Sequence, residues 1–272
     1  MLFVSALLFR FLEEMTEPAD KECRSHVMSA ELLLRILDDN LCSSLLTDAA
    51  LIVVLRQDIF IANLTQRPVG PLANRCNIDR SLTPTSDVMW AYRIMSHAAE
   101  ITNFVYSEES DRSTPTWDKL MAYAKDWENC RPNSFTPLFQ SQTAPPTFPN
   151  PVFASDCHVA GHQYLGLCRI LLLACDPHIP MLGMNGMRML QERDEKTRDY
   201  VRDICGTAMA NSECFPAVST AGLVIGMCGE MFSDPEETGV LLELIAGAEG
   251  HLRWHHLKSK ESLQRFWGLS GS

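Results

Sequence analysis

The apolar residues of this chain repeat with the period of an α-helix along most of its length. Residues 29–39, for example, carry leucine or isoleucine at positions 32, 33, 36 and 37, which is the stripe of one helical face. No convincing run alternates apolar and polar residues between turns, as a half-buried strand would. The β-branched residues of ALIVVL, at 50–55, lie within a helical pattern. We therefore predict an all-α fold of about nine or ten helices that forms a single domain over residues 1–272.

Residue choice at the ends of the apolar stretches indicates where several helices begin and end. Pro115 lies at the first turn of one stretch, and the Asp176-Pro177 pair closes another. Ser233 or Asp234 can cap a third. The helices predicted beyond residue 80 cover residues 83–106, 114–130, 155–177, 187–211, 216–231, 233–245 and 260–268.

A segment rich in proline and phenylalanine interrupts the helical pattern at residues 131–153. Its prolines exclude a helix interior, and its phenylalanines argue against a solvated linker. We expect this segment to lie over the helical body, where it either lines or lids a cavity or only covers the core. The loop at residues 176–187 is a second candidate for such a role.

The charge of the chain excludes several classes of partner. The formal net charge is −11, and no run of basic residues occurs. A nucleic-acid surface needs clustered lysine and arginine to displace counterions from phosphates. The densest charged stretch, residues 191–203, alternates in sign and is typical of a solvated helix face. We expect this chain to bind no nucleic acid by itself and no membrane.

Cysteine usage and the N-terminus favour an intracellular protein, cytoplasmic or nuclear. The chain has ten cysteines but no C-x-x-C pair, and Cys168 lies in the apolar run LGLCRILLLAC, where a thiol behaves as a small hydrophobe. Reduced, buried cysteines are therefore expected. The N-terminal MLFVSALLF lacks a basic stretch and is too short to cross a bilayer, so we interpret it as a core helix.

Two histidines provide the most specific spacing among the candidate chemical groups. His158 and His162 lie four residues apart in a predicted helix, so both rings project from one face. No glutamate follows His158 as in the zinc-protease motif, which favours structural or pocket-lining histidines over a metal site. As pocket members the two rings could act as acid and base near neutral pH.

Motifs that hold cofactors are missing from the sequence. It has no Walker loop, no G-x-G-x-x-G after a strand and no D-x-D-x-D calcium loop. Ser219 and Thr220 lie outside any G-x-S-x-G elbow, so a serine hydrolase is unsupported. We expect neither a cofactor nor a metal ion.

The stretch LRQDIFIANLTQRPV, residues 55–69, places charges within an apolar helical pattern. On a helix Arg56, Asn63 and Arg67 share a face with Phe60, whereas Asp58 points roughly 160–200° away from Arg56. Each charge therefore needs a different neighbour, because an unpaired buried charge is very costly. These residues are either structural anchors between helices or a polar face turned into an internal cavity.

Seven pieces of the chain together resemble one protein family. In order they are LRQDIFIANLTQRPV, CNIDRSLTP, DVMWAYRIM, RPNSFTPLF, HQYLGLCRILLLACDPHIP, VRDICGTAMAN and MCGEMFSDPEE. The ordered set resembles the regulatory (middle homology) domain of fungal zinc-cluster transcription factors and covers nearly the whole chain. The resemblance implies an all-α domain that modulates activity, dimerises or senses small molecules.

The sequence departs from that family in one large respect. Typical members carry a binuclear zinc cluster held by six cysteines, and no such cluster is present here. The resemblance also supplies no agreed catalytic residues. We therefore expect either a cut-down regulator that acts through partners, or this fold put to another use.

Two functional hypotheses follow. The first is a stand-alone protein that binds a hydrophobic small molecule and has become a cofactor-free cyclase or isomerase, pericyclase-like, of a fungal secondary metabolite. The second is a non-enzymatic regulator, a ligand-sensing or dimerising remnant, for which a homodimer is left open. The catalytic candidates are Arg56, Asp58, His158 and His162, and the substrate-binding candidates are Asn63, Arg67, Trp90, Arg93 and Tyr164.

Overall fold

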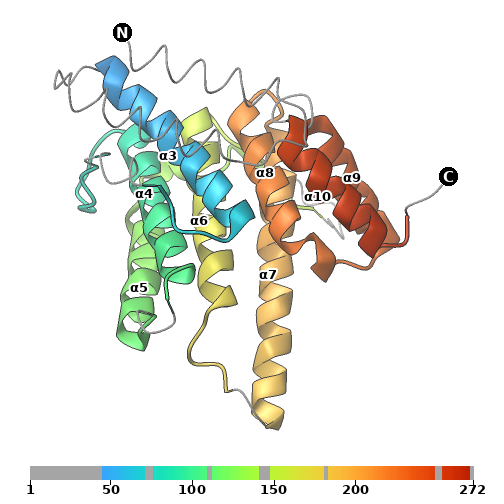
Figure 1. Ribbon diagram of the computed structural model, residues 1–272. Helices are drawn as coiled ribbons and strands as arrows, with labels where there is room; N and C mark the ends of the chain where they lie inside the picture. Colours follow the sequence, from blue (N-terminus) through green and yellow to red (C-terminus); the bar gives the residue numbers. More distant parts are fainter. Residues whose placement is uncertain are drawn as a thin grey trace.

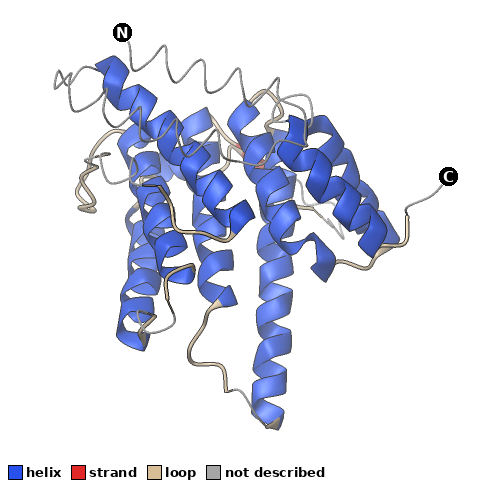
Figure 2. Cartoon of the chain, viewed as in Figure 1, coloured by secondary structure: helices blue, strands red, loops and turns tan. Residues whose placement is uncertain are grey.

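The computed structural model describes residues 45–70, 76, 78–108, 112–140, 148–180, 183–248 and 253–269. The helices predicted at the N-terminus and at residues 29–39 lie outside these ranges, as does the middle of the segment at 131–153. In the described part, eight α-helices and one small sheet form the regular structure, and Figure 2 shows how far the helices dominate. The protein is predominantly all-α, with slightly fewer described helices than predicted for the whole chain.

Most helices of the described part are joined by short connections. The α-helices are α3 (Leu45–Thr65), α4 (Asp87–Val105), α5 (Thr114–Cys130), α6 (Asp156–Ala174), α7 (Met184–Ala210), α8 (Phe215–Cys228), α9 (Pro235–Ala248) and α10 (Arg253–Phe266). Two 3₁₀ turns, η3 (Asn133–Phe135) and η4 (Gly229–Met231), accompany them. Strands β1 (Phe139–Gln140) and β2 (Pro151–Val152) pair antiparallel, with Phe139 opposite Val152.

Local chemistry explains the ends of several helices. The Ser86 side chain caps α4 by accepting a hydrogen bond from the Met89 amide at 3.3 Å. Pro115 lies in the first turn of α5, as predicted. Helix α3 ends at Thr65 because Gln66 adopts a positive φ of 53° and Pro68 cannot continue the helix.

Helix α6 forms the centre of the molecule. It packs against α4 on one side and α7 on the other, while α5 covers both α4 and α6. Leu167, Cys168 and Leu172 of α6 are completely buried. Helix α3 packs across α4 and α8, and α7 extends well beyond its neighbours in Figure 1. None of the described helices is both long and apolar enough to cross a membrane.

The described ends of the proline- and phenylalanine-rich segment contact the helices closely. Phe135, Phe148 and Phe153 are buried, whereas Phe139 is 64% exposed. Strand β2 is attached to the end of α7 by Asn211, whose Nδ2 donates to Pro151 O at 2.8 Å and whose Oδ1 accepts from the Phe153 amide at 3.1 Å. Whether the segment lines or lids a cavity stays a prediction.

Candidate functional site

The two charged residues of α3 have different surroundings. Arg56 is half-buried, and its buried Nε donates no hydrogen bond within the described residues. Asp58 is buried at 8% exposure, and its carboxylate lies beside Gly70, 3.2 Å from the position that a Cβ would take there. Neither residue lines either of the two pockets described below.

Asn63 and Arg67 differ although a shared face was predicted for them. Asn63 is 2% exposed and connects α3 to α4, since its Nδ2 donates to Ile59 O at 2.8 Å and to Thr102 Oγ1 at 3.1 Å. Arg67 is exposed and lies two residues beyond the end of α3. Its amide donates to Ala62 O at 2.9 Å, which closes the last turn.

Arg93 and Trp90 form a buried anchor on α4. Arg93 is 1% exposed, and its guanidinium donates to Asp79 O at 2.9 Å, Thr83 O at 2.8 Å and Asp79 Oδ2 at 3.0 Å. Its guanidinium carbon also lies 4.9 Å from the centre of the Trp90 ring. Trp90 in turn makes an edge contact with Trp127. These contacts fix the loop before α4 to the core.

The two candidate histidines of α6 bind two different carboxylates. His158 Nε2 lies 2.8 Å from Asp87 Oδ2, and His162 Nε2 lies 2.6 Å from Asp203 Oδ2. The hydrogen bond from His158 lowers the pKa of Asp87, and a hydrogen bond from Ser134 lowers it further. The two pairs thus attach α6 separately to α4 and to α7. Tyr164, also on α6, is buried at 4% exposure.

No metal-binding cluster accompanies these histidines in the described part of the chain, where no group of three or more suitable side chains gathers. Aromatic rings occupy the space beside them instead. Phe135 lies 4.7 Å from the His158 ring, and Phe153 lies 5.1 Å from the His162 ring. Neither histidine lines either described pocket.

A partly enclosed pocket of about 580 Å³ lies where several helices end, and we call it the five-helix pocket. Its walls come from α3, α4, α6, α7 and α8. The segments between these helices add Gln66, Tyr106, Arg112 and Met231. The floor is buried and largely apolar, with Ile170 and Leu171 at 2% and 1% exposure. Exposed residues at the mouth include Gln66 and Ala174. This size suits a small organic ligand.

The protonated groups of the five-helix pocket are weak nucleophiles. Burial raises the pKa of the Cys228 thiol to about 12 and also raises the pKa of Tyr106. Arg193 at the wall is held by its neighbour, because its Nη2 donates to Asp194 Oδ1 at 2.7 Å. At neutral pH these groups can hold or orient a ligand, but a thiolate or phenolate would form only at high pH.

Asn63 lies in the wall of the five-helix pocket, and one atom of its side-chain amide has no partner among the described residues. Its Oδ1 is buried and accepts no hydrogen bond from any described residue, while both donors of its Nδ2 group are used. Of the nine predicted site residues, only Asn63 lines this pocket. The structure adds four polar residues to this pocket that the sequence did not indicate, Tyr106, Arg112, Arg193 and Cys228. The sequence around each of them shows no motif.

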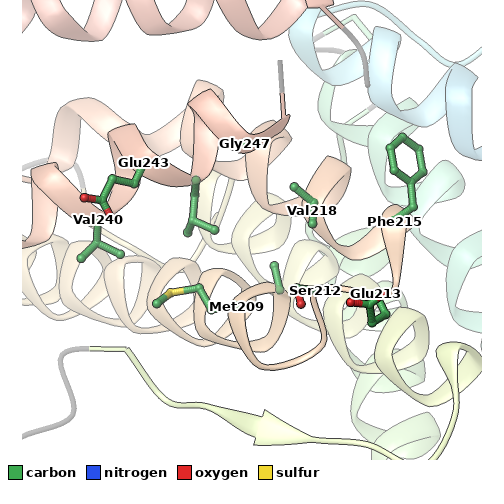
Figure 3. Close-up of a pocket in the computed structure, with 10 residues that line it drawn as sticks. Met209, Ser212, Glu213, Phe215, Val218, Val240, Glu243 and Gly247 are labelled. Atoms are coloured by element: carbon green, nitrogen blue, oxygen red, sulfur yellow. The ribbon is translucent and has the colours of Figure 1, made fainter. Parts of the chain in front are cut away.

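A second, more open pocket lies between the end of α7, the start of α8 and α9, and we call it the α7–α9 groove. It has a volume of about 510 Å³. Figure 3 shows Met209, Val218 and Val240 projecting into it, with Glu213 and Glu243 from different elements. Met209 and Phe215 are 43% and 38% exposed. No buried polar atom without a hydrogen bond lies among its lining residues.

Comparison with protein-family models, with curated proteins and with solved structures finds no match to this chain.

Proposed function

We propose that this protein binds an apolar small molecule in the five-helix pocket. One observation carries the proposal: a partly enclosed cavity of about 580 Å³ reaches from an exposed mouth to buried apolar side chains of α6. Pockets of this size are the usual sites of small organic ligands. The α7–α9 groove is smaller, and two of its apolar lining residues face solvent.

The geometry supports binding more directly than catalysis. The four catalytic candidates, Arg56, Asp58, His158 and His162, line neither described pocket, and both histidines are held by carboxylates. The resemblance to regulatory domains of fungal transcription factors also supports a ligand-binding role. A cofactor-free cyclisation or isomerisation of a fungal secondary metabolite stays a prediction. Such a step is feasible because a shaped apolar cavity can promote it by orienting the substrate alone.

A blocked mouth tests the proposal. Ala174 is exposed at the end of α6 and lines the five-helix pocket, so Ala174→Trp should fill the mouth without disturbing the core. We expect 1-decanol to bind the wild-type protein in isothermal titration calorimetry and to lose that binding in Ala174→Trp. The control is Val240→Trp, which fills the α7–α9 groove instead and should leave binding unchanged. Equal loss in both variants, or no binding to the wild type, would overturn the proposal.

A further inference from the structure

The α7–α9 groove has apolar side chains on both of its walls. On α9 the lining residues recur at the spacing of one helical face and include Val240, Leu244 and Gly247. Val240 and Leu244 are partly exposed, whereas Leu241 between them is completely buried in the core. On the other wall Met209 of α7 is 43% exposed, and Figure 3 shows Val240 pointing toward it. Helix α9 therefore presents a second apolar face, which the described helices leave partly open.

The backbone around the groove favours a helical partner over an extended one. Its lining residues belong to α7, α8, α9 or the turn between α7 and α8, and no described strand lines it. Helices use their backbone groups internally, so an extended peptide would find no sheet edge to pair with. At Gly247 an added Cβ would meet no described heavy atom within 4 Å, which leaves room for another helix beside α9.

The ionisable side chains that line the groove are both carboxylates, Glu213 and Glu243. Both are exposed, and neither forms an ion pair with a described residue. By contrast Glu237, also on α9, accepts a hydrogen bond from Arg202 Nε at 2.7 Å. Figure 3 shows Glu243 and Glu213 on opposite sides of the view, with Met209 between them. A partner with lysine or arginine next to its apolar side chains would complement both charges.

We propose that the α7–α9 groove is a docking site for a basic amphipathic helix of a partner protein. Apolar side chains of that helix enter between α7 and α9, and its lysine or arginine side chains lie beside Glu213 and Glu243. The exposure of Met209, which suits a small ligand poorly, suits a helix that covers an open groove along its length. No residue lines both this groove and the five-helix pocket, so the two sites are separate.

Three labelled peptides test the proposal on the full chain by fluorescence anisotropy. The first is built of leucine and lysine at the spacing of an amphipathic helix. The second has glutamate in place of each lysine, and the third has the composition of the first in scrambled order. We expect saturable binding of the first at physiological salt, and binding weaker by roughly 10-fold or more for the other two. Equal binding of either control peptide would overturn the proposal.

Substitutions in the groove locate the binding site. Val240→Trp fills the groove and should weaken binding of the leucine–lysine peptide by roughly 10-fold or more, whereas Ala174→Trp should leave it unchanged. Met209→Ala removes an apolar contact and should weaken binding by roughly 3- to 10-fold. Met184→Ala makes the same change at an exposed position of α7 outside the groove and should have no effect. The two methionine variants decide the question if Val240→Trp fails to fold.

The two glutamates separate a specific site from general attraction to an acidic chain. Glu213→Gln and Glu243→Gln should each weaken binding of the leucine–lysine peptide by roughly 2- to 5-fold. Glu261→Gln makes the same change in net charge at an exposed position of α10 outside the groove, and its effect should stay below about 2-fold. Equal effects of all three substitutions would overturn the proposal.

Other occupants of the groove would give different results. Self-association of the protein that Val240→Trp abolishes would identify a second copy of the chain as the occupant and overturn the proposal. Failure of all three peptides to bind the wild type would overturn it as well. Neither result bears on the five-helix pocket, whose test uses 1-decanol.

Discussion

Arg93 is a buried residue whose role can be isolated by a single substitution. The hydrogen-bond partners of its guanidinium lie in the loop before α4, and Asp79, the carboxylate among them, is largely exposed. The guanidinium therefore serves the fold by holding that loop, and neither described pocket includes Arg93.

We predict that Arg93→Met lowers the free energy of unfolding by about 3 kcal/mol, because the loop loses several hydrogen bonds to a charged donor. Chemical denaturation with urea measures the change. The control is Arg188→Met, an exposed residue on α7 whose ion pair with Glu192 spans 3.6 Å, for which we expect less than about 0.5 kcal/mol. Equal effects of the two substitutions would contradict the anchor role.

His97 is a completely buried histidine on α4 that is expected to be neutral. Its Nε2 lies 2.9 Å from Leu120 O and must carry the hydrogen, while its Nδ1 accepts from Arg80 Nη2 at 2.6 Å. Burial is the largest cause that lowers the pKa of His97, and the nearby Arg80 charge acts in the same direction. Glu100 raises this pKa but does not outweigh burial.

The lowered pKa of His97 predicts a loss of stability in mild acid. Below the ordinary histidine pKa of 6.5 the unfolded chain binds a proton that the folded protein resists, so the free energy of unfolding falls as the pH decreases from there. Urea denaturation between pH 8 and pH 5.5 should show a steeper fall for the wild type than for His97→Gln. Parallel curves would show that His97 does not contribute.

Single residues were the least predictable part of the site from sequence. The helical pattern of residues 55–69 predicted one face for Asn63 and Arg67, but it could not show that Arg67 lies beyond the helix end, which depends on the backbone of Gln66. The spacing of His158 and His162 correctly placed both on α6, but the carboxylates that hold them come from residues 71 and 41 positions away. Sequence periodicity carries no information about such partners.

At the scale of elements, the contact between α7 and the segment before β2 is unusually close. A Cβ at Gly206 would lie 1.7 Å from Pro149 O, a backbone atom that cannot move aside without shifting the segment. Glycine at this position therefore lets the chain between Phe148 and Phe153 lie directly on the helix.

We predict that Gly206→Ala destabilises the protein by about 3 kcal/mol, because either the segment or the helix must move. Gly239→Ala on α9 is the matched control, since no atom lies within 4 Å of the added Cβ. That change should stabilise the protein by about 0.5–1 kcal/mol through helix propensity. Thermal denaturation of both variants provides the measurement, and a neutral Gly206→Ala would show that the segment yields easily.

Helix positions were predictable because they depend on local chemistry. The prediction for α5 matches its observed bounds, since Pro115 lies in its first turn and the tryptophans at 117 and 127 lie on its buried face. Helix α7 begins three residues before its predicted start, after Gly183 at a positive φ of 94°. The first turn of α7 is exposed and has no apolar stripe, so the sequence pattern did not indicate where the helix begins.

At the scale of the whole molecule, the reactivity of each cysteine depends on how deeply the core buries it. No disulfide joins two described cysteines. Burial strongly raises the pKa of Cys168 and of Cys205, whereas Cys130 at the end of α5 is exposed. Buried protonated thiols react slowly, because the thiolate is the reactive species.

We predict that a thiol reagent at pH 7.5 labels Cys130 in the native protein, and labels Cys168 and Cys205 only after unfolding. Peptide mass spectrometry after timed labelling locates each modified residue. In denaturant without reductant all ten cysteines should react if the chain is fully reduced. Fewer labelled cysteines would reveal a disulfide and contradict the expectation drawn from composition.

The pocket itself could not be foreseen from the sequence. Its lining residues run from Asn63 to Met231, and most lie near helix ends, where the amphipathic pattern is weakest. Periodicity identifies the face of a helix that is buried, but it does not show which ends meet in space.

A pocket assembled from five helices exists only while those helices remain packed together. Any molecule that occupies it is therefore linked to the folding equilibrium, because the unfolded chain offers no such site. A ligand at a hundredfold excess over its dissociation constant would add about 2.7 kcal/mol to the stability of the whole molecule. A rise in melting temperature across a panel of extracts would thus detect the natural ligand without any knowledge of its chemistry.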